Sequence, residues 1–267
     1  GFPFYRNTDF KYFAPCEAGF ETMLEELSKA EKYIFMEYFI IEEGIMFNSI
    51  LSILEDKVKQ GVEVRVMYDD MGSLGTLPAS YAKQLEKKGI KAVSFNRVSP
   101  IINTIMNHRD HRKILVIDGK VAFSGGANLA DEYINKRVKY GHWMDNIICI
   151  KGKAVWSYLV MFLTNWNALR HEDFDYSVFK CTDSFNESNN DGYIVPYAET
   201  PLDQELTGQS VYEDLLNSAN EYVYIMTPYL IIDSEMVNTL IHTAKKGVDV
   251  RIIMPGIADK QIVHDIG

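Results

Sequence analysis

The feature that most constrains the fold of this chain is an internal repeat in which apolar strands alternate with amphipathic helices. Residues 19–68 predict the order helix, strand, helix, strand, and residues 208–254 predict the same order. The copies also agree in sequence, since Gly247-Val-Asp-Val-Arg-Ile-Ile253 corresponds to Gly61-Val-Glu-Val-Arg-Val-Met67. Near-continuous apolar strands between helices are typical of a sheet that is covered on both faces. We therefore expect an α/β fold with a mostly parallel sheet, built by duplication of one unit.

The first copy continues beyond residue 68. A helix, a strand, a hairpin, a further strand and a long helix are predicted, in that order, at 78–88, 90–95, 113–124, 143–150 and 153–169. The residues after the long helix are polar and rich in turn-forming types. The sequence thus predicts a first repeat over 1–180, a connection over 181–207 and the start of a second repeat over 208–267.

One segment combines residue types that suit phosphodiester chemistry. It follows the pattern H-x-K-x(4)-D-G-x(4)-S-G-G-x-N, whose 18 residues contain His111, Lys113, Asp118, Gly126 and Asn128. An imidazole is a potential nucleophile, a lysine supplies a fixed positive charge, and an amide donates hydrogen bonds. Phosphoryl transfer depends on placing such groups around the phosphate. The alternative interpretation is a basic residue pair on an ordinary hairpin.

The same segment predicts a β-hairpin. The apolar run 113–117 ends in Asp118-Gly119, a strong hairpin signal. Alternate side chains of a strand share a face, so His111 and Lys113 point to the same side. Asp118 has the opposite parity and lies at the turn, where we expect it to serve the hairpin or a neighbouring ion pair. Two glycines after the second strand allow Asn128 to turn back towards the pair.

These residues resemble the HKD motif of the phospholipase D superfamily. The resemblance narrows to the bacterial cardiolipin synthase branch in five segments, Glu37–Ile41, Val64–Gly72, Asn107–Asp118, Phe123–Asn135 and Gly141–Asp145. It extends from about residue 10 to the end of the chain. It implies a phospholipase D-like α-β-α sandwich that is duplicated, with the second repeat incomplete.

The resemblance also implies phosphatidyl transfer through a phosphohistidine. In similar enzymes the histidine of one HKD motif attacks phosphorus, and the histidine of a second motif transfers the alcohol protons. His111 is then the nucleophile, and Asp118 belongs to the catalytic set. The residues that bind the phosphate oxygens are Lys113, Asn128 and Gly126. Cardiolipin synthases condense two phosphatidylglycerol molecules into cardiolipin and glycerol, and we expect no metal or other cofactor.

A carboxylate is normally needed to orient the imidazole through its second nitrogen. Asp145 is the candidate, and a simple strand-end ion pair is the alternative. Asp131 and Glu132 follow the motif and are interpreted as solvated acids at the start of a helix. Asp69 and Asp70 end a predicted strand, where they either line the pocket or cap a turn.

The resemblance implies a two-motif site, of which we expect this sequence to contain only half. His111 follows Gly61 by 50 residues, whereas only 20 residues follow the corresponding Gly247. We therefore expect the second HKD segment beyond Gly267, in the rest of a longer chain. The 267-residue chain alone should lack turnover.

Other functions of the superfamily stay open at this point. Water as the acceptor would give a hydrolytic phospholipase D, and the motif does not separate hydrolysis from transfer. A phosphodiesterase or nuclease is a further alternative, but the net charge of −10 argues against a nucleic-acid partner. A non-enzymatic binder of lipid headgroups is the remaining hypothesis for this chain taken alone.

Partners and location follow from the resemblance. Phosphatidylglycerol, other anionic phospholipids and the membrane surface are the implied partners. The chain has no run of about 18 apolar residues, and it begins without Met or a signal peptide, which indicates a soluble, excised piece. Full-length enzymes of this branch carry hydrophobic N-terminal segments. We thus expect a cytoplasmic-side domain of a bacterial protein anchored in the cell membrane. Three widely spaced cysteines suggest a reducing compartment.

Overall fold

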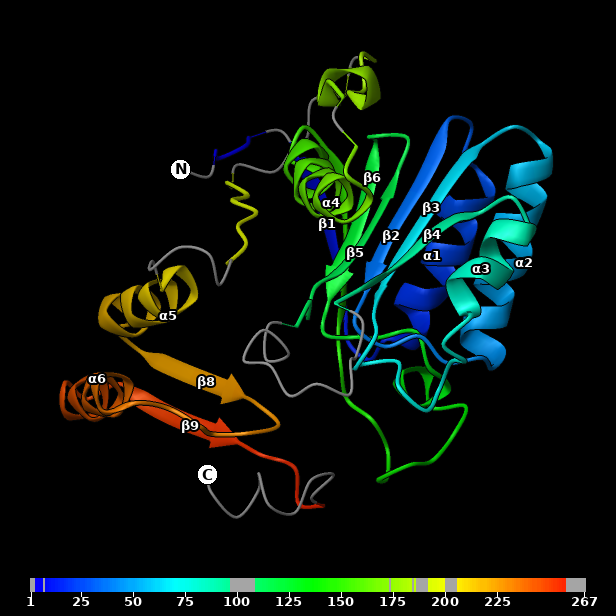
Figure 1. Cartoon of the computed structure of the whole chain (residues 1–267). Helices are drawn as coiled ribbons and strands as arrows, with labels where there is room; N and C mark the ends of the chain where they lie inside the picture. Colours follow the sequence, from blue (N-terminus) through cyan, green and yellow to red (C-terminus); the bar gives the residue numbers. More distant parts are fainter. Residues whose placement is uncertain are drawn as a thin grey trace. The chain divides into compact units, whose positions relative to one another are not determined.

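Seven strands form the central sheet of the first unit, which spans Gly1–Tyr197 (Figure 1). They are β1 (Thr8–Phe13), β2 (Tyr33–Tyr38), β3 (Glu63–Asp69), β4 (Lys91–Phe95), β5 (Lys113–Ile117), β6 (Val121–Gly125) and β7 (Ile147–Gly152). In this computed structural model they run in the order β1-β7-β6-β5-β2-β3-β4. The structure describes residues 3–6, 8–96, 109–172, 174–183, 185, 192–199 and 206–257.

The expectation of a mostly parallel sheet is wrong. β2 pairs in parallel with β3, and β3 with β4, but β2–β5, β5–β6, β6–β7 and β1–β7 are antiparallel. For β5 and β6 the reason lies in the turn between them, where Asp118 and Gly119 both have positive φ, of 54° and 67°. Such a turn joins antiparallel neighbours directly, whereas parallel strands need a long crossover connection.

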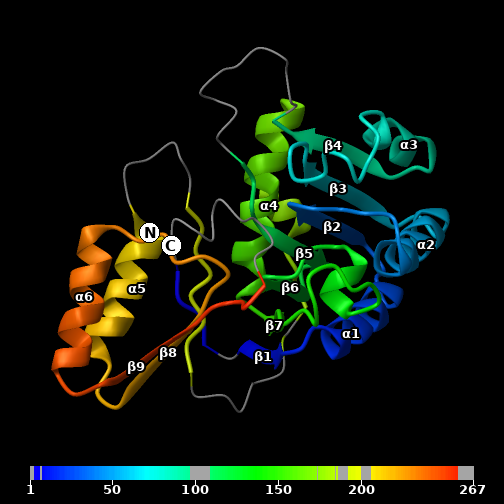
Figure 2. The ribbon, with the colours of Figure 1, turned by 90° about the horizontal axis from the view of Figure 1, so that it is seen from below.

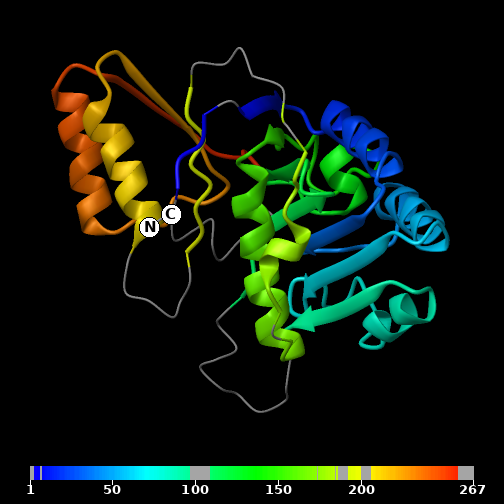
Figure 3. The same cartoon turned by 90° about the horizontal axis from the view of Figure 1, so that it is seen from above.

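Helices cover both faces of this sheet (Figures 2 and 3). One face carries α1 (Glu17–Ser28), α2 (Ile45–Lys59) and α3 (Tyr81–Lys87), and the other carries α4 (Val155–Arg170). Side-chain alternation along β2 separates two cores, because Met36 faces α1 and α2 while Phe35 faces α4. The predicted three-layer α-β-α arrangement is confirmed. In the described part of the chain, no helix has the length and apolar character needed to cross a membrane.

The second unit, Ala198–Gly267, repeats the local order of the first. It contains α5 (Thr207–Ser218), β8 (Tyr222–Met226), α6 (Ser234–Lys245) and β9 (Asp249–Ile253). β8 and β9 pair in parallel, and Tyr222 lies opposite Asp249 as Tyr33 lies opposite Glu63. The boundary between the two units, after Tyr197, falls within the stretch 181–207 that the sequence marks as a polar connection.

The edge strand β1 is missing from the sequence prediction. It pairs with β7, and its four central residues are exposed. An edge strand that faces solvent carries no strong apolar alternation, so its pairing comes from the neighbouring strand and leaves no clear periodic signal.

Candidate active site

The His111–Lys113 pair lies at the start of β5 in the first unit. Lys113 Nζ is 3.1 Å from His111 Nδ1, and it also donates a hydrogen bond to the His111 carbonyl oxygen. The His111 side chain is exposed, whereas Lys113 is buried. The two side chains therefore meet on one face of the strand, as their spacing predicts. An accessible imidazole next to a fixed ammonium group can approach a phosphate from solvent.

Phe39 packs against both members of the pair. Its ring centroid is 4.8 Å from that of His111 and 5.4 Å from Lys113 Nζ. Phe39 follows β2 directly, and Tyr38 is the register partner of Lys113. Sequence reasoning did not single out this residue. An aromatic residue directly after a buried strand could have pointed to Phe39. Its place beside His111 can be inferred only when β2 is known to pair with β5.

Burial changes the acidity of the ammonium group. Desolvation lowers the pKa of Lys113 to about 8, while the charges of Asp110, Asp145 and Asp69 act in the opposite direction. The charged form still predominates near neutral pH, since the pH then lies below this pKa. Lys113 can thus supply a positive charge to a bound phosphate, and it loses that charge in mildly alkaline solution.

Asp145 lies near Lys113 on the loop that precedes β7. Burial raises the pKa of its carboxyl group, and the hydrogen bond from Asn146 N–H, a contact with Trp143 and the charge of Lys113 oppose that rise. Its Oδ1 atom packs against Gly126, where an added Cβ would lie only 2.0 Å away. A glycine at 126 is therefore required for Asp145 to occupy this place.

Gly126 and Asn128 form hydrogen bonds within the protein. The Gly126 N–H donates to the Asn146 carbonyl oxygen at 3.2 Å. Asn128 is buried, its Oδ1 accepts from Ile40 N–H at 3.0 Å, and its Nδ2 donates to Tyr133 Oη at 2.8 Å. In this structure both residues shape the loop after β6 and tie it to the segment that follows β2.

Asp118 lies at the opposite end of β5 from Lys113. Its carboxylate accepts three backbone hydrogen bonds of 2.8 Å, from the N–H groups of Glu31, Lys32 and Tyr33. It therefore fixes the hairpin to the start of β2, which is the kind of role that its parity predicts. The length of β5 separates it from the His111–Lys113 pair, so any contribution to catalysis is indirect.

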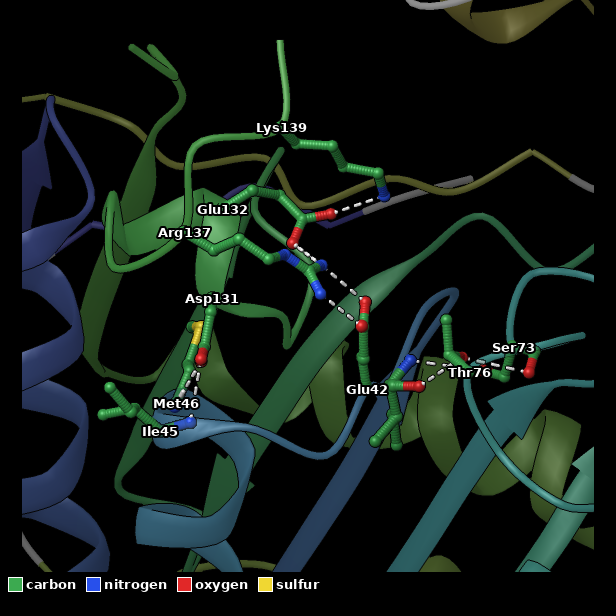
Figure 4. A network of polar contacts seen from close by, with 10 residues as sticks. Glu42, Ile45, Met46, Ser73, Thr76, Asp131, Glu132, Arg137 and Lys139 are labelled. Atoms are coloured by element: carbon green, nitrogen blue, oxygen red, sulfur yellow. Dashed lines mark hydrogen bonds and ion pairs between the residues drawn. The ribbon is translucent and has the colours of Figure 1, made fainter. Parts of the chain in front are cut away.

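The interpretation of Asp131 and Glu132 as solvated acids is wrong. Asp131 accepts hydrogen bonds from Ile45 and Met46 N–H, so it caps the start of α2 (Figure 4). Glu132 is only 2% exposed. The sequence shows the two acids at the start of a short helix, but only the chain fold brings the start of α2 to Asp131 and two cations to Glu132.

Glu132 is the centre of an ion-pair network at the rim of the sheet (Figure 4). Its carboxylate contacts Lys139 at 2.9 Å and Arg137, and Arg137 also pairs with Glu42. These cations lower the pKa of Glu132 in spite of its burial. The network joins the loop after β2 to the loop after β6, close to the segment that contains Phe39.

Asp69 connects β3 to the strand that carries the motif. Its fully buried carboxylate accepts from Gly72 N–H at 2.9 Å and from Asp110 N–H at 3.0 Å, and Arg109 Nη1 lies 3.4 Å away. Of the two roles predicted for Asp69, turn capping is the one that these contacts show. The sequence reasoning missed Asp110, the residue before His111. The bond from its N–H to Asp69 fixes the backbone at this point.

The fold and the His111–Lys113 geometry are those of a phospholipase D-like domain. A family model described as "Cardiolipin synthase, PLD-like domain" matches residues 23–161 and 212–266, which is more than half of the chain. The chain therefore belongs to the cardiolipin synthase family of phospholipase D-like domains.

Curated relatives agree with this membership. The chain is 35% identical over 242 residues to a cardiolipin synthase of Alkalihalophilus pseudofirmus, covering 90% of this chain and 48% of that protein. It is 34% identical over 259 residues to a cardiolipin synthase of Staphylococcus aureus, covering 96% and 52%. An uncharacterized protein of Streptococcus mutans serotype c is 54% identical over 98% of this chain and 56% of its own length. The chain thus spans about half the length of these relatives.

Solved structures show the same fold. The phosphatidylserine synthase of Haemophilus influenzae Rd KW20 superposes with a TM-score of 0.64 at 18% identity, covering 95% of this chain and 63% of that chain. The polyphosphate kinase of Porphyromonas gingivalis gives a TM-score of 0.54 at 14% identity, covering 93% and 38%. At these identities the likeness concerns the fold alone.

Proposed function

We propose that this chain carries the first HKD motif of a phosphatidyltransferase that condenses two phosphatidylglycerol molecules into cardiolipin and glycerol. The observation that carries this proposal is the contact of 3.1 Å between His111 and Lys113 at the start of β5, in a chain of the cardiolipin synthase family. Its substrates are then anionic phospholipids drawn from a membrane surface, and the protein is a membrane-associated enzyme of lipid synthesis.

In the proposed reaction, an imidazole nitrogen of His111 attacks phosphorus. The bond between phosphorus and the glycerol headgroup oxygen breaks, which leaves a phosphatidyl group on the histidine. The headgroup hydroxyl of a second phosphatidylglycerol then attacks the phosphohistidine and releases His111. A histidine of the second HKD motif, expected in the rest of the protein, gives a proton to the departing glycerol and takes one from the incoming alcohol.

Three further roles belong to this proposal. The Lys113 ammonium group neutralises the non-bridging oxygens as their charge grows in the transition state. Asp145 orients the His111 imidazole, supported by its place beside Lys113 and over Gly126. Asn128 and Gly126 contribute to phosphate binding by shaping the loop, because their polar groups bond to Tyr133, Ile40 and Asn146.

The test uses full-length protein and vesicles of phosphatidylglycerol. We expect cardiolipin and glycerol as products, and a covalent phosphatidyl-protein adduct when the reaction is quenched early. His111→Ala should lower cardiolipin formation by at least about a thousandfold, because the nucleophile is lost. His242→Ala is the matched control, since His242 is exposed on α6 in the second unit, and it should leave the rate unchanged.

Other products would decide against the proposal. Phosphatidic acid without cardiolipin would assign the protein to the hydrolytic phospholipases D. Undiminished activity in His111→Ala would remove His111 from the mechanism. We also expect no turnover by the 267-residue chain alone, so robust cardiolipin formation by it would contradict the two-motif site.

A further inference from the structure

A buried cluster of charged residues lies behind the strand that carries the His111–Lys113 pair. His111 and Lys113 have odd numbers and face one side of the strand, whereas the even-numbered neighbours Asp110 and Arg112 have the parity of Ile114, which faces α4. Glu37 of β2 has the same facing as Phe35, towards α4. We call Glu37, Asp69, Asp110, Arg109 and Arg112 the rear charge cluster.

Glu37 is the most deeply buried member of the rear charge cluster. It is 0% exposed and lies in the middle of the sheet, opposite Ile114 of β5. Its Oε1 atom accepts a hydrogen bond of 2.8 Å from Asn165 Nδ2 of α4, and Arg112 Nη1 lies 3.8 Å away. A carboxyl group at this depth needs compensation for every polar atom.

Asp110 links Glu37 to the backbone of the motif. Its Oδ1 atom accepts from Arg112 N–H at 3.3 Å and lies 3.9 Å from Arg112 Nε. Its own N–H donates to Asp69. These two bonds hold the backbone N–H groups of Asp110 and Arg112, which flank His111. The contacts of Asp110 therefore fix the chain on both sides of His111, just before β5.

One oxygen of each acid is left without a partner by these contacts. Glu37 Oε2 and Asp110 Oδ2 are buried and accept no hydrogen bond from any N–H or O–H donor in the described part of the chain. Both side chains lie within 4 Å of the Arg112 guanidinium group, so the two carboxyl groups are neighbours, and one shared proton would satisfy both oxygens. A hydrogen bond between two carboxyl groups requires that one of them carries a proton.

The contacts around Arg112 favour one bound proton. A single guanidinium group, that of Arg112, faces both Glu37 and Asp110, at 3.8 and 3.9 Å. Burial and the neighbouring Asp110 carboxyl group raise the pKa of Glu37, while Arg112 and Asn165 oppose the rise. An unpaired charge at this depth would be strongly destabilising.

We propose that Glu37 and Asp110 share one proton at neutral pH, and that this pair is a positioning element that holds residues 110–112 so that His111 and Lys113 face the substrate. Loss of the proton places two carboxylates side by side next to Arg112, Asn165, Asp69 and Arg109, with the Lys113 charge also acting on Asp110. The repulsion pushes Asp110 away from β2 and releases the entry to β5. Since the pKa of Glu37 is raised on folding, this contribution to stability is complete at low pH and is lost as the pH rises through the raised pKa.

The first test detects the proton itself and needs no substrate. Infrared spectra of the full-length protein at neutral pH should show the carbonyl band of a buried, protonated carboxyl group, and Glu37→Gln should remove it. Glu132→Gln is the matched control, because Glu132 is also buried but its partners Arg137 and Lys139 keep it ionised. Absence of the band, or its persistence in Glu37→Gln, would overturn the proposal.

The second test concerns positioning and rests on the proposed function. In Glu37→Gln or Asp110→Asn, an amide N–H replaces the shared proton, so kcat should change by no more than about threefold and the part of the pH profile due to the pair should disappear. The double variant Glu37→Gln/Asp110→Asn leaves Arg112 without a carboxylate and places two amides face to face. Its kcat should fall by at least about tenfold, with KM little changed.

Thermal unfolding of each variant separates positioning from loss of the fold. A double variant that folds and keeps the wild-type kcat would overturn the positioning role, as would single variants that lose as much activity as the double variant. If the wild-type protein makes no cardiolipin, the proposed function fails, but the infrared result still decides whether the pair shares a proton.

Discussion

The two copies of the repeated unit contain the same local arrangement. In the first, the Arg65 guanidinium group stacks on Phe35 at 4.8 Å and its Nη2 pairs with Glu63 at 2.9 Å. In the second, Arg251 stacks on Tyr224 at 5.0 Å and its Nη2 pairs with Asp249 at 2.8 Å. A strand pair of the same sequence type thus forms the same cation–π contact and the same ion pair in both units.

The surroundings of the two arginines differ. The Arg65 side chain is 5% exposed and the Arg251 side chain is 64% exposed. Three further rings, those of Trp166, Phe174 and Phe179, lie 5.1–5.2 Å from the Arg65 guanidinium group. They come from α4 and the segment after it, which cover this face of β2 and β3. In the described part of the second unit, β8 and β9 have only α5 and α6. The same local contact is thus buried in one unit and exposed in the other, so we expect it to contribute more to stability in the first unit.

Arg65→Ala should give the largest loss of stability of the substitutions that test this comparison. The substitution empties a space between four aromatic rings and leaves Glu63 without its guanidinium partner, which should cost about 3–5 kcal/mol. Urea unfolding of the 267-residue chain measures it through the transition of the first unit. A loss below about 1 kcal/mol, the range of exposed pairs, would mean that burial adds nothing to the contact.

The second prediction compares two buried cations of the first unit. A guanidinium group does not titrate in the accessible pH range, but the pKa of the Lys113 ammonium group is lowered to about 8. Cardiolipin formation by the full-length protein should therefore decline as the pH rises through this value, approaching about tenfold per pH unit well above it. Lys113→Arg tests the cause: the guanidinium group cannot titrate in this range, so its residual activity should lack this decline. A decline of the same shape in Lys113→Arg would assign it to another group.

Arg251→Ala should have the smallest effect. Its ion pair and its ring contact are exposed to water, where such contacts contribute little to stability. The urea midpoint should move far less than in Arg65→Ala, and raised salt should reduce even that change. A loss as large as that of Arg65→Ala would show that Arg251 is covered in solution, and the contrast between the two units would no longer hold.

Local patterns in the sequence predicted most of the secondary structure of the first unit and part of the candidate site. Periodicity located nearly all the helices and strands of the first unit, and the Asp118-Gly119 pair located the hairpin. Two-residue spacing placed His111 and Lys113 on one face of the strand. These predictions succeed because each depends on neighbours a few residues apart, where backbone geometry alone sets the directions of side chains.

The features that the sequence did not predict depend on contacts between residues far apart in the chain. The mixed order of the sheet, the edge strand β1, the ring of Phe39 beside His111 and the cap that Asp131 provides for α2 all depend on pairing between distant segments. The sequence shows Glu37 as one acid in an apolar strand and Asp110 as another acid before a histidine. Only the pairing of β2 with β5, covered by α4, buries both and brings them together, because the cost of removing charges from water depends on what surrounds them in three dimensions.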